Sequence, residues 1–203
     1  MEHSAWAVLD WRRQVRGIYQ AVREESDPRR AHAAWATARS RLLRTHPASP
    51  VPEEARERHG GAVTAPYDPA FRFEVPVDRE VAPERREVMT GTDGVVPLER
   101  IGRVALADLG TLDLWWVAVY GGGLFVPFRD ATSGHSSYGA GRYVLDTGKG
   151  ADLGGGPDML VVDLNFAYQP SCAYDQAWAC PLPGAENSLS GPVPVGEQHA
   201  ALR

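Results

Sequence analysis

The feature that most constrains the fold of this chain is a change in the spacing of its apolar residues near residue 67. Up to residue 46, apolar side chains recur every three or four positions, as they do along one face of an α-helix. From Phe71 to Val77 they alternate with polar or small residues, as in a strand that buries one face. A helical segment followed by a β-rich segment predicts an α+β protein.

Residues 1–46 are predicted to form two helices. The first carries an apolar stripe of Trp11, Val15, Ile18, Tyr19 and Val22, and the second one of Ala31, Ala34, Trp35, Ala38 and Leu42. Between them, Asp27 suits the N-cap of the second helix and Pro28 its first position. Pro47 should end that helix. Residues 47–66 are rich in proline, charge and glycine and are predicted to be a loop, with a short helix after Pro52 as an option.

Residues 67–203 are predicted to form a β-rich core with a long C-terminal loop, so that 1–203 make a single domain. Strands are expected at 71–77, 101–106, 112–120, 124–128, 142–146 and 159–166, with a hairpin turn at Asp93-Gly94. Short turns between consecutive strands favour an antiparallel meander, which closes into a barrel or packs as a sandwich with the helices against it. Trp115 and Trp116, adjacent on one strand, should point to opposite faces, one of them into the core.

Composition and charge exclude several classes of protein. The chain has 21 basic and 26 acidic residues and a formal charge of −5, which argues against a non-specific nucleic-acid binder. It contains no apolar run near the roughly 18 residues that indicate a membrane span, and its N-terminus lacks a signal-peptide pattern. The expectation is a cytoplasmic protein with no nucleic-acid or membrane partner. The oligomeric state is left open.

A first cluster of polar groups lies in "FRDATSGHSSYGAGRY", at the end of an expected strand. It contains Arg129, Asp130, His135, Tyr138, Arg142 and Tyr143. The arginines can bind a carboxylate or phosphate, the aspartate or histidine can act as a general base, and the tyrosines can donate to an oxyanion. The alternative is structural: an Arg–Asp ion pair inside the protein, with glycines needed for backbone angles that other residues avoid.

A second cluster lies in "DLNFAYQPSCAYDQAWACPLPGAEN", at and beyond the last expected strand. It contains Asp163, Asn165, Tyr168, Cys172, Cys180, Glu186 and Asn187. Seven residues separate the two cysteines, which is not the spacing of a CxxC pair or a zinc knuckle, and they are interpreted as structural thiols or a loop-closing disulfide. A catalytic Cys–His pair with His135 has no supporting signature.

No metal site or cofactor is predicted. A zinc site made by His135 and the two cysteines would lack any recognised ligand spacing, and the remaining histidines are expected at the surface. These are His3, His32, His46, His59 and His199. The chain contains no GxxxxGK[ST], GxSxG, HExxH or strand-to-helix GxGxxG signature. A flavin-binding barrel is a third, weaker alternative, suggested only by the β-rich architecture, and fold analogy alone is weak evidence of function.

The two clusters also carry a family resemblance. "VPFRDATSGHSSYGAGRY", "VVDLNFAYQPSCAYDQAWACPLPGAEN" and "VPVGE", in this order, resemble a prokaryotic family known as domain of unknown function 1684. The resemblance extends to "HPASPV" and "YDPAFRFEVPV", and departs from the family pattern at Leu164 and Gln169. It implies a bacterial protein whose matched polar residues form a candidate site, and it implies no activity.

Two functions remain open at this point. The first is a small-molecule-binding protein or enzyme acting on a polar or anionic metabolite, in a pocket between the two clusters. Asp130, Tyr138 and Glu186 would then be catalytic, and Arg129, Arg142, Tyr143, Asp163, Asn165, Tyr168 and Asn187 would bind the ligand. The second is a non-enzymatic interaction or scaffold protein in which the same residues form a buried polar network. An open cleft would favour the first, and a closed, fully paired cluster the second.

Overall fold

The computed structural model describes residues 4–90, 94–156 and 158–199. Two long helices come first, α1 (Ala5–Glu24) and α2 (Pro28–Thr45), followed by the short α3 (Glu53–Arg56). The carboxylate of Asp27 caps α2 by accepting a hydrogen bond from the Arg29 backbone N–H at 2.9 Å, and Pro28 is the first helical residue. The predicted helical segment, its capping residue and the short helix after Pro52 are confirmed.

The described residues form two antiparallel sheets. Their strands are β1 (Arg72–Pro76), β2 (Arg85–Thr90), β3 (Gly94–Ala105), β4 (Thr111–Val117), β5 (Leu124–Phe128), β6 (Arg142–Asp146) and β7 (Met159–Asp163). Five of them follow one another in the order β2-β3-β4-β5-β6, which confirms the predicted meander. Thr90 pairs with Gly94 across the predicted hairpin, whose Asp93 lies outside the described residues. The sheets do not close into a barrel, and their arrangement is that of a sandwich.

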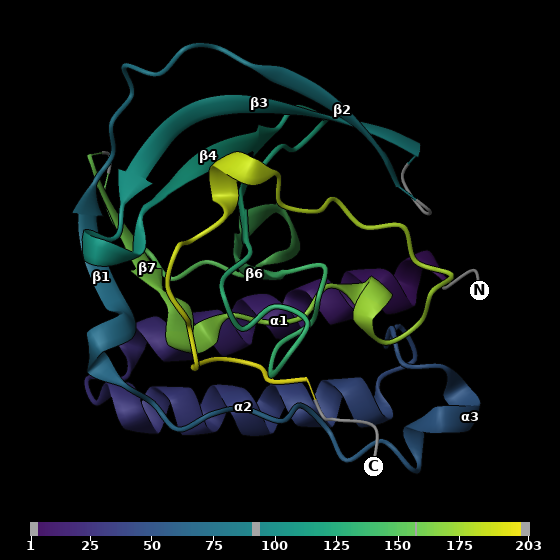
Figure 1. Cartoon of the computed structure of the whole chain (residues 1–203). Helices are drawn as coiled ribbons and strands as arrows, with labels where there is room; N and C mark the ends of the chain where they lie inside the picture. The colour runs from purple at the N-terminus through teal and green to yellow at the C-terminus, as the bar shows by residue number, and fades with distance from the viewer. Residues whose placement is uncertain (1–3, 91–93, 157, 200–203) are drawn as a thin grey trace.

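The second sheet pairs β1 with β7, from Arg72 opposite Asp163 to Pro76 opposite Met159. This pairing joins the start of the β-rich region to its last strand, and the sequence pattern did not indicate it. Figure 1 shows the pair at one end of the molecule, between the five-stranded sheet and the helices. Two strands end earlier than predicted, β4 at Val117 and β7 at Asp163. In β7 the cause is the Asp163 carboxylate, which accepts from the Asn165 N–H and starts a 3-10 turn at Leu164.

The five-stranded sheet has an apolar core on each of its faces. Towards the helices, Leu112 and Leu114 of β4 and Val126 of β5 share a core with Tyr19 of α1 and Trp35 of α2. On the opposite face, a smaller core contains Val96, Leu98, Trp115, Phe125 and Tyr143. The C-terminal loop contacts this second face, where the Trp115 indole donates to the Asn187 side-chain oxygen at 3.4 Å. Burial on both sides explains why β5, LFVPF, reads as a continuous apolar run.

The adjacent tryptophans behave as predicted. Trp115 is 2% exposed, whereas Trp116 points to the other side and is 40% exposed. The two residues differ because successive side chains of a strand alternate between its faces.

The expectation that the histidines lie at the surface is wrong for His32 and His46, which are both 5% exposed. His32 lies on the inner side of α2, among the rings of Trp35, Tyr67 and Phe166. His46 ends α2 against α1: its Nδ1 accepts from the Ala48 N–H, and its Nε2 donates to the Asp10 carboxylate at 3.0 Å. Tertiary packing buries both rings: His32 against Tyr67 and Phe166, which lie outside α1 and α2, and His46 against α1. His3 lies outside the described residues.

Candidate functional site

Arg142 and Asp130, two predicted site residues, form a buried ion pair. The Arg142 side chain is fully buried and donates to Asp130 Oδ2 at 2.8 Å. It also donates to the backbone oxygens of Val193, Val195 and Glu197, at 2.8, 2.5 and 3.1 Å. Burial lowers the pKa of the guanidinium, and the carboxylate of Asp130 opposes this. The pair thus connects the start of β6 to the C-terminal segment and has no exposed surface.

A second buried cluster surrounds Glu197, which lies in the "VPVGE" sequence. Its carboxylate accepts from the Arg39 guanidinium at 2.7 and 3.0 Å, from the Tyr174 hydroxyl at 3.1 Å and from the Gln169 N–H. The Arg39 guanidinium stacks on the ring of Tyr168 at 4.7 Å. Tyr168, a predicted ligand-binding residue, therefore packs against a helix residue that the sequence motifs did not include. The cluster attaches α2 to the chain beyond β7.

Three further predicted residues contact the second face of the sheet. Glu186 forms a two-pronged ion pair with Arg86 of β2, at 2.7 and 3.1 Å. Burial opposes ionisation of Glu186, yet its bonds to Arg86 lower its pKa. Asn187 is fully buried and donates to the backbone oxygens of Asp113 and Pro127. The Tyr143 ring is buried against Phe125, and its hydroxyl donates to the Pro181 oxygen at 2.5 Å.

The predicted catalytic residues Asp130, Tyr138 and Glu186 have separate partners. Asp130 pairs with Arg142 and Glu186 with Arg86, whereas the Tyr138 hydroxyl donates to the Cys172 oxygen at 3.2 Å. Burial and the hydrogen bond to Cys172 together raise the pKa of Tyr138 to about 12. Each group therefore belongs to its own cluster in this structure.

Two of the candidate polar residues in the first motif, Arg129 and His135, are exposed. Arg129 follows β5 and donates to the Gly139 backbone oxygen at 2.9 Å. His135 lies in the turn of the motif, where its backbone N–H donates to the Thr132 oxygen. Within the described part of the chain, no group of three or more histidine, cysteine, aspartate or glutamate side chains is placed to hold a metal.

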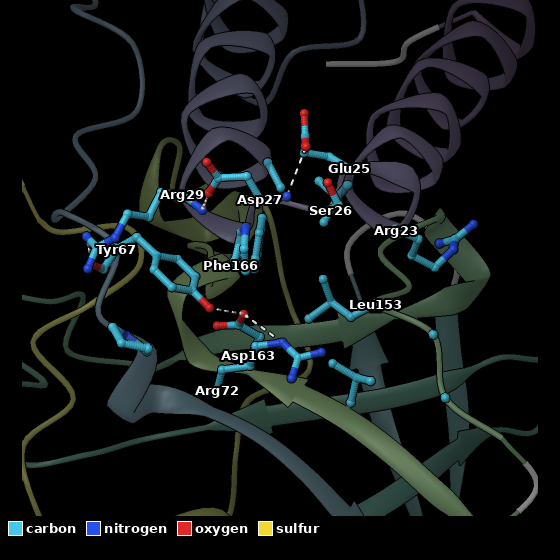
Figure 2. A pocket seen from close by; sticks show the side chains of 17 residues that line it. Arg23, Glu25, Ser26, Asp27, Arg29, Tyr67, Arg72, Leu153, Asp163 and Phe166 are labelled. Atoms are coloured by element: carbon cyan, nitrogen blue, oxygen red, sulfur yellow. Dashed lines mark hydrogen bonds and ion pairs between the residues drawn. The ribbon is translucent and has the colours of Figure 1, made fainter.

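A cavity of about 700 Å³ lies where the turn between α1 and α2 faces β1 and β7. Of the predicted site residues, Asp163 lines it, at the end of β7. Tyr67 and Arg72 approach the same carboxylate from the segment before β1 and from its first residue, as Figure 2 shows. The Tyr67 hydroxyl donates to Asp163 Oδ2 at 3.3 Å, and Arg72 Nε lies 3.9 Å from that oxygen. Three groups of different chemistry thus meet at one wall of the cavity.

The environment of Asp163 makes it unusual among the acidic residues of this chain. Its side chain is 3% exposed, and burial raises its pKa, against the lowering effect of two hydrogen bonds from Asn165 and the charge of Arg72. Burial, together with the negative Asp163, raises the pKa of Tyr67 to about 12, so the phenol remains a proton donor at neutral pH. A buried carboxyl with a raised pKa, beside a phenol and a guanidinium, is able to exchange a proton with a bound molecule.

The walls of the cavity carry both charges and apolar groups. Arg23, at the end of α1, and Arg72 are each 36% exposed, and they pair with Asp152 and Glu74 respectively. The sides are completed by apolar residues, among them Val22, Leu153, Val161 and Phe166. This mixture of apolar walls and a few polar groups is typical of small-molecule sites.

Asn165 joins the segment before β1 to the end of β7 at one wall of the cavity. Its side chain accepts from the Asp68 N–H and donates to the Asp68 oxygen, both at 2.8 Å, and it also donates to Asp163 Oδ1. A predicted ligand-binding residue therefore fixes the "YDP" segment beside β7. Tyr67 and Arg72 were not predicted as site residues, although both lie in the "YDPAFRFEVPV" sequence. The information that identifies them is the antiparallel register of β1 and β7, which places Arg72 opposite Asp163. No local sequence pattern shows this register.

Comparison with known proteins identifies the family of this chain. A model of the family described as protein of unknown function, DUF1684, matches residues 58–198, which is most of the chain. The chain belongs to the DUF1684 family. A solution NMR structure of an uncharacterized protein from Haloarcula marismortui is 34% identical, with a TM-score of 0.59, and covers 82% of this chain and 91% of the other. No curated protein matches.

The DUF1684 match contains one side of the cavity and excludes the other. Tyr67, Arg72 and Asp163 lie inside the matched residues 58–198, whereas Arg23 and Asp27 of the helical turn precede them. The polar groups around Asp163 therefore belong to the DUF1684 part of the chain, and the helices add a wall to it.

Proposed function

We propose that this protein binds a small polar or anionic molecule in the cavity beside Asp163, where Asp163 acts as a general acid or base if the bound molecule reacts. The observation that carries the proposal is the buried Asp163 carboxyl at the cavity wall, within reach of the Tyr67 hydroxyl and the Arg72 guanidinium. The lining of this cavity includes Asp163 but none of the residues of the first motif.

The contacts of Asp163 support a role beyond structure. Asn165 satisfies Oδ1 with two hydrogen bonds, while Oδ2 has only the longer contacts with Tyr67 and Arg72. A carboxylate kept for structure alone usually has closer partners, as Asp130 has with Arg142. Oδ2 of Asp163 is therefore the oxygen that would meet a ligand.

The charges support a ligand that carries a carboxylate or phosphate. Arg72 presents a planar set of donors next to Asp163, and Arg23 adds a second positive charge to the cavity lining. Both guanidiniums are partly exposed, and Asp152 and Glu74, with which they pair at the surface, are more exposed still. An anion can therefore replace Asp152 and Glu74 at low cost. A polar molecule with one anionic group fits this arrangement.

Thermal unfolding in the presence of a panel of small carboxylates and phosphates tests the proposal. A ligand should raise the melting temperature of the wild type, and Arg72→Ala should remove most of that rise. Arg85→Ala is the matched control, because Arg85 also pairs with a neighbouring glutamate, Glu99, at the surface and lies outside the cavity lining. Equal loss of the rise in both variants, or no rise with any of the compounds, would refute the proposal.

A second candidate function, an interaction or scaffold protein, is favoured by the buried pair of Arg142 and Asp130. These two residues are fully buried and bonded to one another, which supports a structural role for this part of the first motif. Under this alternative the cavity is empty in the cell. Asp163→Asn and Arg72→Ala would then leave every measured binding property of the protein unchanged.

A further inference from the structure

The polar groups of the Asp163 cavity meet at one end of it. The Tyr67 hydroxyl donates to Asp163 Oδ2 at 3.3 Å, and Arg72 Nε lies 3.9 Å from the same oxygen. Oδ1 of Asp163 accepts from the backbone and the side chain of Asn165. A group bound at this end therefore meets one guanidinium, one phenol and one carboxyl oxygen.

The side walls next to this polar end are apolar. They include Val22 of α1, Val161 of β7, and Leu153 and Phe166. In the view of Figure 2, the side chains of Leu153 and Phe166 lie on either side of the space above Asp163. These side chains have no polar atom to offer a ligand, whereas burying methylene groups against them is favourable. The body of a ligand that fits here is therefore apolar.

The far side of the cavity carries negative charge. Glu25 and Asp27 line it in the turn between α1 and α2, and Figure 2 shows them across from Asp163. The Asp27 carboxylate caps α2, and Glu25 accepts from the Asp27 N–H and from Arg30. The hydrogen bond from Arg30 lowers the pKa of Glu25. A second anionic group on the far end of a ligand would meet these carboxylates, which disfavours a dicarboxylate.

Arg72 is the guanidinium placed to bind a single negative charge. Arg23 and Arg29 also line the cavity, but each of them donates to a backbone oxygen. Arg72 pairs instead with Glu74, whose side chain is 57% exposed. An anion at the polar end can take the place of Glu74, which then returns to water.

The charges at the polar end favour a carboxylate over a phosphate. Arg72 and an ionised Asp163 cancel one another, whereas with Asp163 protonated the pair carries a single positive charge. A carboxylate neutralises that charge, but a phosphate monoester brings about −1.5 to −2 at pH 7. A protonated carboxyl also donates a strong hydrogen bond to a carboxylate. Burial already raises the pKa of Asp163, which lowers the cost of protonating it.

We propose that the ligand of this cavity is a free monocarboxylic acid with an apolar body. Its carboxylate lies against Arg72, accepts from the Tyr67 hydroxyl and shares one proton with the Asp163 carboxyl. Its body lies between Leu153 and Phe166. The acid binds as its anion while Asp163 takes one proton from water, and no covalent bond of the ligand changes. The inference rests on the proposed function and names the class of its ligand.

Proton uptake by Asp163 makes binding depend on pH. Above the pKa of Asp163 the affinity should fall by up to about tenfold for each unit of rising pH. The groups that face Asp163 are Arg72, the Asn165 amide and Tyr67, whose pKa is about 12. His32 of α2 lies behind Tyr67, with the ring centroids 5.8 Å apart, and burial lowers its pKa. A pH dependence above neutral pH therefore reports on Asp163.

Isothermal titration calorimetry with simple compounds tests the ligand class. Hexanoate should bind at least about tenfold more tightly than acetate, because its additional methylene groups are buried. It should also bind at least about tenfold more tightly than hexanedioate, hexyl phosphate or hexylamine. N-acetyl-leucine, which presents its carboxylate as the end of a peptide does, should bind more weakly than hexanoate. Tighter binding of any of these compounds than of hexanoate would overturn the inference.

The same titrations separate failure of this inference from failure of the proposed function. If hexanedioate or hexyl phosphate binds more tightly than hexanoate and Arg72→Ala abolishes that binding, the ligand class is wrong and the proposed function stands. If none of the compounds binds, or if Arg72→Ala leaves their binding unchanged, both are wrong.

Two further variants test where the head and the body of the ligand lie. Hexanoate should bind wild type more weakly as the pH rises from about 7 to about 8.5, whereas Asp163→Asn, whose amide donates without taking up a proton, should show no such trend. Val161→Thr should weaken hexanoate binding at least about threefold. Val88→Thr is its control, because Val88 is also a partly buried valine of a strand but lies outside the cavity lining.

Circular dichroism establishes that each variant is folded. An equal pH trend in wild type and Asp163→Asn would overturn the shared proton. Equal effects of the two threonine variants would overturn the placement of the apolar body.

Discussion

Replacing Arg142 with leucine tests whether the buried arginine holds β6 to the C-terminal segment. Leucine fills part of the space of the side chain but removes its charge and its donors. The Asp130 carboxylate then lacks its cation, and the backbone oxygens of Val193, Val195 and Glu197 lose their bonds to the guanidinium. All of these groups lie where water has little access.

The size of the effect follows from these contacts. Removing one partner of a buried ion pair costs about 3–5 kcal/mol of the free energy of unfolding. Each buried carbonyl left without a donor adds about 1–3 kcal/mol. Leucine also removes two unfavourable features of the wild type, the desolvated charge of Arg142 and its Nε, which has no hydrogen-bond partner. We expect a net loss of at least about 4 kcal/mol, a large part of the roughly 5–15 kcal/mol of a typical domain.

Urea unfolding followed by tryptophan fluorescence measures this loss. Arg129→Leu is the control, because Arg129 is exposed and a change there should cost less than about 1 kcal/mol. The double variant Asp130→Asn/Arg142→Leu should be more stable than Arg142→Leu alone, since it no longer buries an unpaired carboxylate. A loss below about 1 kcal/mol in Arg142→Leu, or a double variant that is no more stable, would refute the reasoning.

Three further predictions concern single positions. Gly141→Ala should lower the unfolding free energy by at least about 2 kcal/mol in a denaturant titration, because the φ of Gly141 is +102° and an added Cβ would lie 2.6 Å from the Phe128 backbone oxygen. Gly139→Ala is the control. An added Cβ there has its nearest neighbour at 3.5 Å, and this variant should lose less than about 1 kcal/mol. The raised pKa of Asp163 adds stability below about pH 4 that is lost as the pH rises through that pKa. Asp163→Asn should thus gain stability relative to wild type between pH 4 and 7 in urea unfolding, and a constant difference would disprove this. Trp115→Ala should lower the unfolding free energy by about 3–5 kcal/mol, and Trp116→Ala by about 1 kcal/mol or less, because Trp115 is buried and Trp116 is partly exposed. Equal losses in the two variants would contradict this difference in burial.

Local features of this protein were determined by the sequence alone. The cap of α2 at Asp27 depends on residues adjacent in the chain, and so does the alternation that separates Trp115 from Trp116. The antiparallel order of β2 to β5 follows from short connections between consecutive strands. Each of these depends on spacing within a few residues, which a single sequence displays.

Only the tertiary structure decided how the polar motifs are used. Arg129 and Arg142 belong to one motif and have similar chemistry, yet one is exposed and the other is fully buried. The cavity beside Asp163 exists because β1 pairs with β7 across about ninety residues of chain, which brings Arg72 opposite Asp163. Pairing between distant strands and the burial of charges depend on long-range packing, because no local pattern specifies which side of a strand end will face water.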